Sequence, residues 1–187
     1  MITIGIDPGK SGGIVFINGD KIIEMYKCPQ TIEDMAELLE PYRMTWESTI
    51  PITAYIEQVH AFPSDGRSSV FKFGTNYGIW QGLLGANKIE TKFIAPQVWM
   101  KSLELPKDKV SRKRELKIIA QKVVDKQELN KRVTLHTADA VLIGMFGVIQ
   151  SAIDNMSLKQ KVDTLINLRK RDNKWYYKNI PKILIHI

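Results

Sequence analysis

The 187-residue chain has a single cysteine, Cys28, and no apolar run long enough to span a bilayer. One cysteine excludes an intramolecular disulfide and a cysteine-rich zinc site, and it favours a reducing, intracellular setting. The most apolar stretch, 138–153, falls short of the ~20 residues that a transmembrane helix needs, and it contains Asp139. The opening MITIGID lacks the basic and apolar regions of a signal peptide. We therefore expect a soluble, cytoplasmic protein without membrane contact.

Charge is distributed unevenly along the chain. Residues 1–100 contain 8 basic and 11 acidic side chains, a net charge of −3, whereas residues 101–187 contain 19 basic and 9 acidic ones, a net of +10. A strongly basic half is typical of proteins that bind a polyanion, most often nucleic acid. The alternative is an ordinary protein of high isoelectric point whose charges lie on solvated helix faces.

The hydrophobic pattern predicts the element order β-β-β-α-β-α-β-α-α. Three hairpin-linked strands followed by alternating helices and strands indicate an α/β fold with a mixed sheet and helices on both faces. Glycines at four positions of the helix expected over 70–86 predict that another element packs closely against that side. We expect one domain over 1–155 and a short basic C-terminal extension over 156–187.

Three carboxylates stand at the ends of predicted elements of the apolar core. Asp7 follows the first strand, Glu57 ends the fourth and Asp139 begins the last helix. Singly they could be a turn former, a salt-bridge partner and a favourable helix N-terminal charge. Converging carboxylates repel one another, and a divalent cation such as Mg²⁺ is the simplest remedy. Carboxylates holding two such ions can cleave phosphodiesters, and His136 precedes Asp139 by three residues.

Three motifs resemble, in order and spacing, the signatures of RuvC-type Holliday junction resolvases, which are RNase H-like nucleases. They are IGIDPGKSGG (4–13), YIEQVHAF (55–62) and HTADAVLIG (136–144), and the likeness is greatest to short phage and bacterial members. The resemblance covers roughly residues 1–150. It implies an RNase H-like fold with a five-stranded mixed sheet of order 3-2-1-4-5 flanked by helices. It also implies a homodimer that cuts four-way DNA junctions by paired nicks, with two Mg²⁺ per active site and Mn²⁺ as a candidate substitute.

The same resemblance assigns roles to individual residues. Asp7 and Glu57 match metal-binding carboxylates of the first two motifs, and Asp139 matches the last aspartate of the third. The family usually has an acidic residue where His136 stands, so His136 is kept as a metal ligand or proton-handling group. His60 stands where many relatives have an aromatic residue near the junction centre. The glycine-rich helix corresponds to the family's dimer-forming helix.

Basic residues gather before and at the start of a helix for which Ser111 is the expected N-cap. Positive charge there opposes the helix dipole, which suggests that an external anion compensates it. Contacts with the DNA phosphate backbone are the favoured interpretation, and a solvated helix face is the alternative. Besides His60, the predicted DNA contacts are Lys101, Lys107, Lys109, Arg112, Lys113 and Arg114.

The sequence thus predicts a Mg²⁺-dependent, structure-selective endonuclease for four-way or related branched DNA. Two other functions stay open. A non-catalytic protein could bind branched DNA on an RNase H-like scaffold, and an ATP-binding lobe of the actin or Hsp70 type could also open with an aspartate and a glycine-rich hairpin. Such ATPases need two duplicated lobes, however, and 187 residues supply only one.

Overall fold

A five-stranded sheet organises the chain. In the computed structural model, residues 1–45, 47–58, 60, 66–101, 103, 105–127, 129–157 and 160 are described, so the expected extension 156–187 lies almost wholly outside them. The strands are β1 (Ile2–Asp7), β2 (Gly13–Asn18), β3 (Lys21–Lys27), β4 (Ile52–Glu57) and β5 (Glu90–Ile94). The helices are α1 (Ile32–Leu39), the 3-10 turn η1 (Glu40–Tyr42), α2 (Arg67–Ala86), α3 (Pro96–Met100), α4 (Lys109–Lys126) and α5 (Ala138–Asp154).

The strand order is β3-β2-β1-β4-β5, as the resemblance to RuvC-type resolvases implies. β1 pairs with β2 and β2 with β3 in antiparallel fashion, which follows from the two tight hairpin connections. β1 pairs in parallel with β4, and β4 with β5, because a helical crossover separates the members of each pair. The sheet is therefore mixed, with β1 at its centre.

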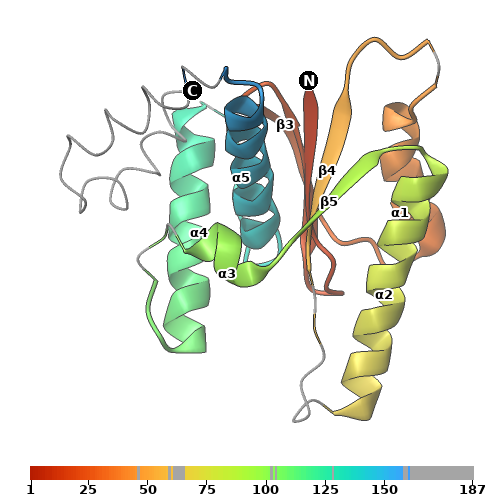
Figure 1. Cartoon of the computed structure of the whole chain (residues 1–187). Coiled ribbons are helices and arrows are strands. Elements are labelled where there is room, and N and C mark those ends of the chain that lie inside the picture. The colour runs from red at the N-terminus through yellow and green to blue at the C-terminus, as the bar shows by residue number, and fades with distance from the viewer. Residues whose placement is uncertain are drawn as a thin grey trace.

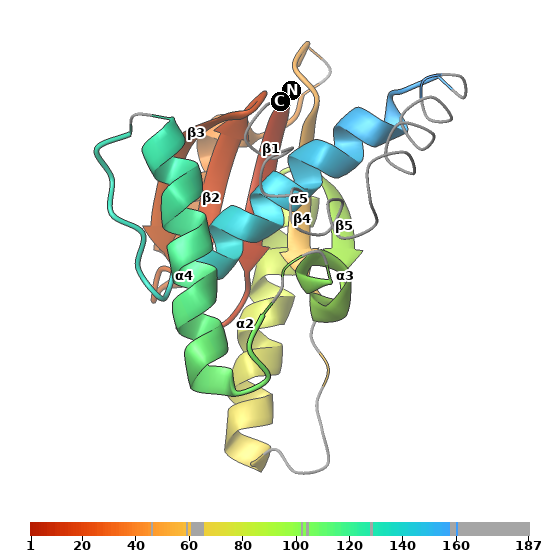
Figure 2. The ribbon, with the colours of Figure 1, turned by 90° about the vertical axis from the view of Figure 1, so that its left-hand side faces the viewer.

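Helices cover both faces of this sheet. α4 and α5 lie on one side and α1 and α2 on the other, as Figure 1 shows with the sheet edge-on. Figure 2 looks onto the side of α4 and α5, with the strands behind them. α2, α4 and α5 all begin at the edge where β1 and β4 end, the lower edge in Figure 1. Side chains at the ends of β1 and β4 are therefore bordered by the N-termini of three helices.

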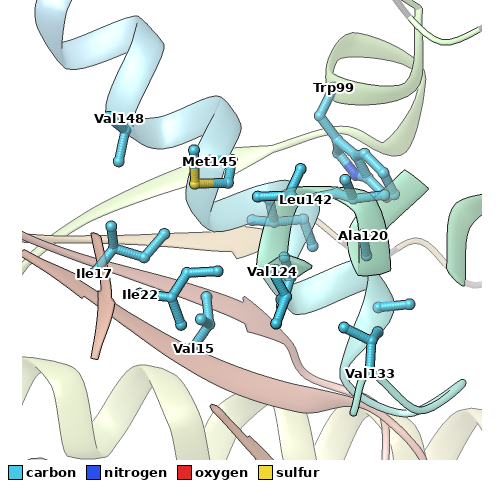
Figure 3. Packing of buried hydrophobic residues seen from close by; sticks show 14 of the residues in the cluster. Val15, Ile17, Ile22, Trp99, Ala120, Val124, Val133, Leu142, Met145 and Val148 are labelled. Atoms are coloured by element: carbon cyan, nitrogen blue, oxygen red, sulfur yellow. The ribbon is translucent and has the colours of Figure 1, made fainter. Parts of the chain in front are cut away.

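Each face of the sheet has its own apolar core, because successive strand residues point to opposite sides. On the side of α4 and α5, one cluster contains the strand residues Val15 and Ile17, Trp99 of α3 and apolar residues of both helices (Figure 3). On the other side, Ile4 and Ile6 of β1 pack with residues of α1 and α2. The central strand is therefore buried on both faces.

The helix starts confirm part of the expected capping and correct the rest. Thr31 caps α1 as predicted, since its side chain accepts a hydrogen bond from the Asp34 amide at 3.1 Å. The prediction that Ser111 caps α4 is wrong, because Asp108 accepts from the amides of Val110 and Ser111 at 3.1 and 2.9 Å. Serine and aspartate are both good N-caps, so the pattern alone did not distinguish them.

Thr137 occupies the N-cap position of α5 but makes no capping hydrogen bond. Its hydroxyl instead accepts from the Thr134 amide at 3.0 Å, within the turn before the helix. The expectation that something packs closely on the glycines of α2 stays a prediction, because no other described element of the chain makes that contact. A Cβ built on Gly74, Gly78, Gly82 or Gly85 would meet no atom within 4 Å. Among the described residues, nothing covers that face of α2.

Candidate active site

Two of the three candidate carboxylates end neighbouring parallel strands. In the β1–β4 register, Ile6 pairs with Ile56, so Asp7 and Glu57 follow at the same edge of the sheet. Alternation along the strands puts Asp7 on the face of Gly5, and Glu57 on the face of Tyr55. This is the face that α5 covers, since Gly5 contacts the backbone of α5 and Tyr55 lies against Gly147 of that helix.

The third carboxylate, that of Asp139, lies near the same edge because α5 packs directly on β1. A Cβ on Gly5 would collide with the carbonyl oxygen of Ala140 and with the backbone of Gly144, so only glycine permits this approach. The contact fixes the first turn of α5 beside the end of β1. Asp139, in that first turn, is 9% exposed.

The three carboxylates influence one another's ionisation. Burial and the nearby Asp7 charge raise the pKa of Glu57 to about 7. Burial and Asp7 likewise raise the pKa of Asp139 to about 6. Burial also raises the pKa of Asp7, against the opposing effects of its hydrogen bond to Gly9 and of the Lys113 and His136 charges. Because these charges act on one another, Asp7, Glu57 and Asp139 share one electrostatic neighbourhood, as the sequence predicts.

The turn after β1 wraps around the Asp7 carboxylate. The Gly9 amide donates to Asp7 Oδ1 at 3.1 Å. A Cβ on Gly12 would collide with the Asp7 carbonyl oxygen and lie 2.6 Å from its carboxyl carbon. The glycines of the first motif therefore let the backbone close over a charged group.

His136 contacts the same turn at Ser11. Its Nδ1 is 2.7 Å from the Ser11 carbonyl oxygen. A carbonyl can only accept, so Nδ1 carries a proton and Nε2 of the neutral ring is free to accept a proton or bind a metal. α5 begins at Ala138, so His136 stands in the turn before the helix, where the Ala138 amide donates to the Thr134 carbonyl oxygen at 3.1 Å.

One residue at the site has no counterpart among the sequence predictions. Trp99 of α3 is buried and its indole N–H donates to Glu57 Oε1 at 3.1 Å. This bond opposes the rise in the pKa of Glu57 and holds the carboxylate toward α3. Nothing local in the sequence indicates the pairing, because the two residues are 42 positions apart. The bulk of Trp99 fits the apolar core equally well.

The start of α4 faces the carboxylates. Lys113 lowers the pKa of Asp7, Glu57 and Asp139, which places its ammonium group near all three. Of the predicted DNA contacts, Arg112 is half-buried and the rest are exposed, namely His60, Lys101, Lys107, Lys109, Lys113 and Arg114. His60 follows the end of β4 by three residues. Phe62, which the second motif also contains, lies outside the described residues.

The donor set suits a hard divalent cation. Three carboxylates supply oxygen ligands of the kind that Mg²⁺ prefers, and one nearby lysine does not neutralise them. Within the described ranges, however, no group of three His, Cys, Asp or Glu side chains could hold a metal ion as it stands. Metal binding would require these carboxylates to draw closer around a shared cation.

The chain has an α/β fold of the RNase H-like type, with a mixed sheet of order β3-β2-β1-β4-β5 and helices on both of its faces. Its fold is RuvC-like: it is similar to Thermus thermophilus RuvC in complex with a Holliday junction substrate, with a TM-score of 0.59 and 16% identity, over 82% of this chain and 96% of that one. A second Thermus thermophilus RuvC structure gives a TM-score of 0.56 and 17% identity, over 82% and 97% of the chains. No protein-family model and no curated sequence matches the chain.

Among the residues that the structure describes, no helix is both long and apolar enough to cross a bilayer.

The raised pKa values predict how the metal-free protein responds to pH. Between about pH 4 and 7, folded Glu57 and Asp139 retain protons that the unfolded chain releases near its ordinary values of 4.5 and 3.8. Stability therefore falls as pH rises through this window, because the folded state binds more protons. Urea unfolding in EDTA at pH 5, 6, 7 and 8 should show that the free energy of unfolding decreases as the pH rises.

Glu57→Gln should flatten that decline, since it removes the buried charge but keeps an oxygen for the Trp99 N–H. At pH 8 we expect a melting temperature a few degrees above wild type, given that 1 kcal/mol shifts a domain of this size by roughly 2–4 °C. Glu37→Gln, at an exposed position of α1, is the matched control and should leave the decline unchanged. A lower melting temperature for Glu57→Gln would mean that the Glu57 charge is stabilising.

Proposed function

We propose that the protein is a Mg²⁺-dependent, structure-selective endonuclease that resolves four-way or related branched DNA by paired phosphodiester hydrolysis. The observation that carries this proposal is the convergence of Asp7, Glu57 and Asp139 at one edge of a RuvC-like sheet. Their pKa values are raised by burial, and those of Glu57 and Asp139 also by the Asp7 charge. A stable scaffold gains nothing from three buried, mutually repelling carboxylates, whereas a site for divalent cations requires them.

Asp7, Glu57 and Asp139 would hold two ions, with His136 Nε2 available beside Asp7. Bound there, Mg²⁺ or Mn²⁺ would activate the attacking water and stabilise the leaving 3′ oxygen. The protein's own groups prepare this site. The Gly9 amide orients the Asp7 carboxylate, the Trp99 indole orients that of Glu57, and the Ser11 carbonyl fixes the tautomer of His136.

The DNA would reach this edge along the start of α4. Four basic residues lie within the first two turns of that helix, namely Lys109, Arg112, Lys113 and Arg114. Asp108 caps the helix and occupies two of its free amides, so the attraction for phosphate comes from the side chains more than from the helix dipole. Lys113 lies near both the carboxylates and this basic surface, and it would contact the phosphate close to the cut.

The uncovered face of α2 supports a homodimer. Gly74, Gly78, Gly82 and Gly85 leave room for the backbone of another helix to approach. Phe71 precedes Gly74 by three residues, which puts it on the same side of the helix. It is 77% exposed and adds an apolar contact to that face. Two copies joined through α2 would present two acidic edges, as paired nicking requires.

Asp7→Asn tests the catalytic proposal. Asparagine keeps an oxygen for the Gly9 amide but removes the anionic ligand, so nicking of a labelled four-way junction in Mg²⁺ should fall more than about 100-fold, beyond the loss typical of an outer-shell substitution. Junction binding in EDTA should stay close to wild type, because affinity comes mainly from phosphate contacts. Circular dichroism checks that the variant is folded.

The matched control is Asp20→Asn in the β2–β3 hairpin, which should cleave like wild type. A wild-type protein that binds junctions but shows no Asp7-dependent nicking would favour the non-catalytic DNA-binding alternative. Thermal stabilisation by ATP, without junction binding, would favour the ATP-binding lobe.

Charge removal tests the DNA surface. Replacing Lys109, Arg112 and Lys113 by glutamine should weaken junction binding and make it less dependent on salt. The slope of log K against log salt concentration should become shallower by up to about 3, since each lost phosphate contact contributes about 0.9. The control removes three charges from later positions of α4, through Lys117, Lys122 and Lys126. Equal effects of the two triple variants would contradict a localised surface and indicate only general attraction.

Gly78→Arg tests the dimer. No described part of the chain lies within 4 Å of the added Cβ, so the fold should be retained while the face of α2 is blocked. Sedimentation should show a monomer at concentrations where wild type is dimeric. Ile118→Arg, at an exposed apolar position of α4, should remain dimeric. A monomeric wild type, or a dimeric Gly78→Arg, would refute dimerisation through α2.

A further inference from the structure

The peptide group between Pro8 and Gly9 is held from both sides. On one side, the Asn76 side-chain amide of α2 donates to the Pro8 carbonyl oxygen. On the other, the Gly9 N–H donates to Asp7 Oδ1 at 3.1 Å. In a planar trans peptide the carbonyl and the N–H point in opposite directions, so a contact that fixes one also aims the other. Asn76 thereby controls the direction of the hydrogen bond that reaches the Asp7 carboxylate.

A second contact makes Asn76 the anchor of the whole turn. The same nitrogen lies 3.5 Å from Cys28 Sγ. The Cys28 backbone amide in turn donates to the Gly12 carbonyl oxygen at 2.9 Å, just before β2 begins. The turn over residues 8–12 is consequently tied to α2 at its first peptide and, through Cys28, at its last.

Packing alone does not account for an amide at this position. Asn76, Trp80 and Leu84 are the buried residues of α2, so Asn76 occupies one of the helix's core positions and is 6% exposed. A buried hydrogen-bonded pair adds little net stability over apolar groups of the same shape. A hydrogen bond differs from an apolar contact in that it fixes the orientation of the two groups it joins.

We propose that Asn76 is a positioning residue for the Asp7 carboxylate and acts through the Pro8–Gly9 peptide. The inference rests on the proposed function, in which Asp7 binds a divalent cation. If the amide is removed, the Pro8 carbonyl loses its partner and the peptide plane can rotate. The Gly9 N–H then no longer fixes Asp7 Oδ1, and the carboxylate is less well ordered for metal binding.

The test compares Asn76→Leu and Asn76→Ser with Asn87→Leu. Leucine matches the size of asparagine but has no donor, and serine is too short to reach Pro8. Asn87, at the C-cap of the same helix, is the matched control, since its side-chain amide also donates to a backbone carbonyl, that of Leu83 at 2.9 Å. Each variant therefore loses an amide-to-carbonyl bond of α2.

Three measurements on the full chain without DNA separate positioning from a structural role. Mn²⁺ titration followed by electron paramagnetic resonance should show affinity reduced about tenfold or more in both Asn76 variants, the scale of lost outer-shell partners. The Gly9 amide proton resonance should move upfield in these two variants only. Thermal unfolding should show that Asn76→Leu and Asn87→Leu lower the melting temperature by similar amounts.

The outcomes distinguish the two proposals. The positioning role is overturned if folded Asn76→Leu or Asn76→Ser binds Mn²⁺ like wild type with an unmoved Gly9 resonance. It is also overturned if Asn87→Leu weakens Mn²⁺ binding as strongly as they do. A wild-type protein that binds no Mn²⁺ would instead overturn the metal site of the proposed function, while the Gly9 resonance would still report whether Asn76 orients the peptide.

Discussion

The direct contact between α5 and β1 determines where everything else at the acidic edge lies. Because Gly5 has no side chain, the backbone of α5 reaches the central strand at Ala140 and Gly144. That approach sets the first turn of α5 at the end of β1, and with it Asp139. Parallel pairing of β1 with β4 then adds Glu57 at the same edge. The close approach at Gly5 and the parallel β1–β4 pairing thus bring together residues from three distant segments.

Bringing them together is unfavourable for the protein alone. Burial raises the pKa of all three carboxyl groups, and Asp7 raises those of Glu57 and Asp139 further. The opposing interactions are few: the Gly9 amide and the His136 charge on Asp7, the Trp99 indole on Glu57 and the Lys113 charge on all three. Three carboxylates facing so few opposing groups leave an excess of negative charge, so the edge is suited to receive cations.

The strands and the three carboxylates could be predicted because the relevant signals are local. Alternating β-branched residues mark β1 and β4, and an acidic residue that ends such a run must lie at a sheet edge. The start of α4 could not be fixed in the same way, because Asp108 and Ser111 are both competent caps. Trp99 and Asn76 were missed since their partners, Glu57 and Pro8, are 42 and 68 positions away. Only the folded topology joins them.

α2 acts on the site from one face while leaving the other free. Its buried side carries Asn76, which contacts the turn after Asp7, and its opposite side carries the uncovered glycines. A helix is stiff across its diameter, so a partner that docks on the glycine face would also limit movement of Asn76 against Pro8. In the proposed dimer, subunit association and the order of the Asp7 carboxylate would therefore be linked through a single helix. Such a link would favour cutting by the assembled pair over cutting by an isolated subunit, which suits a reaction that needs two coordinated nicks.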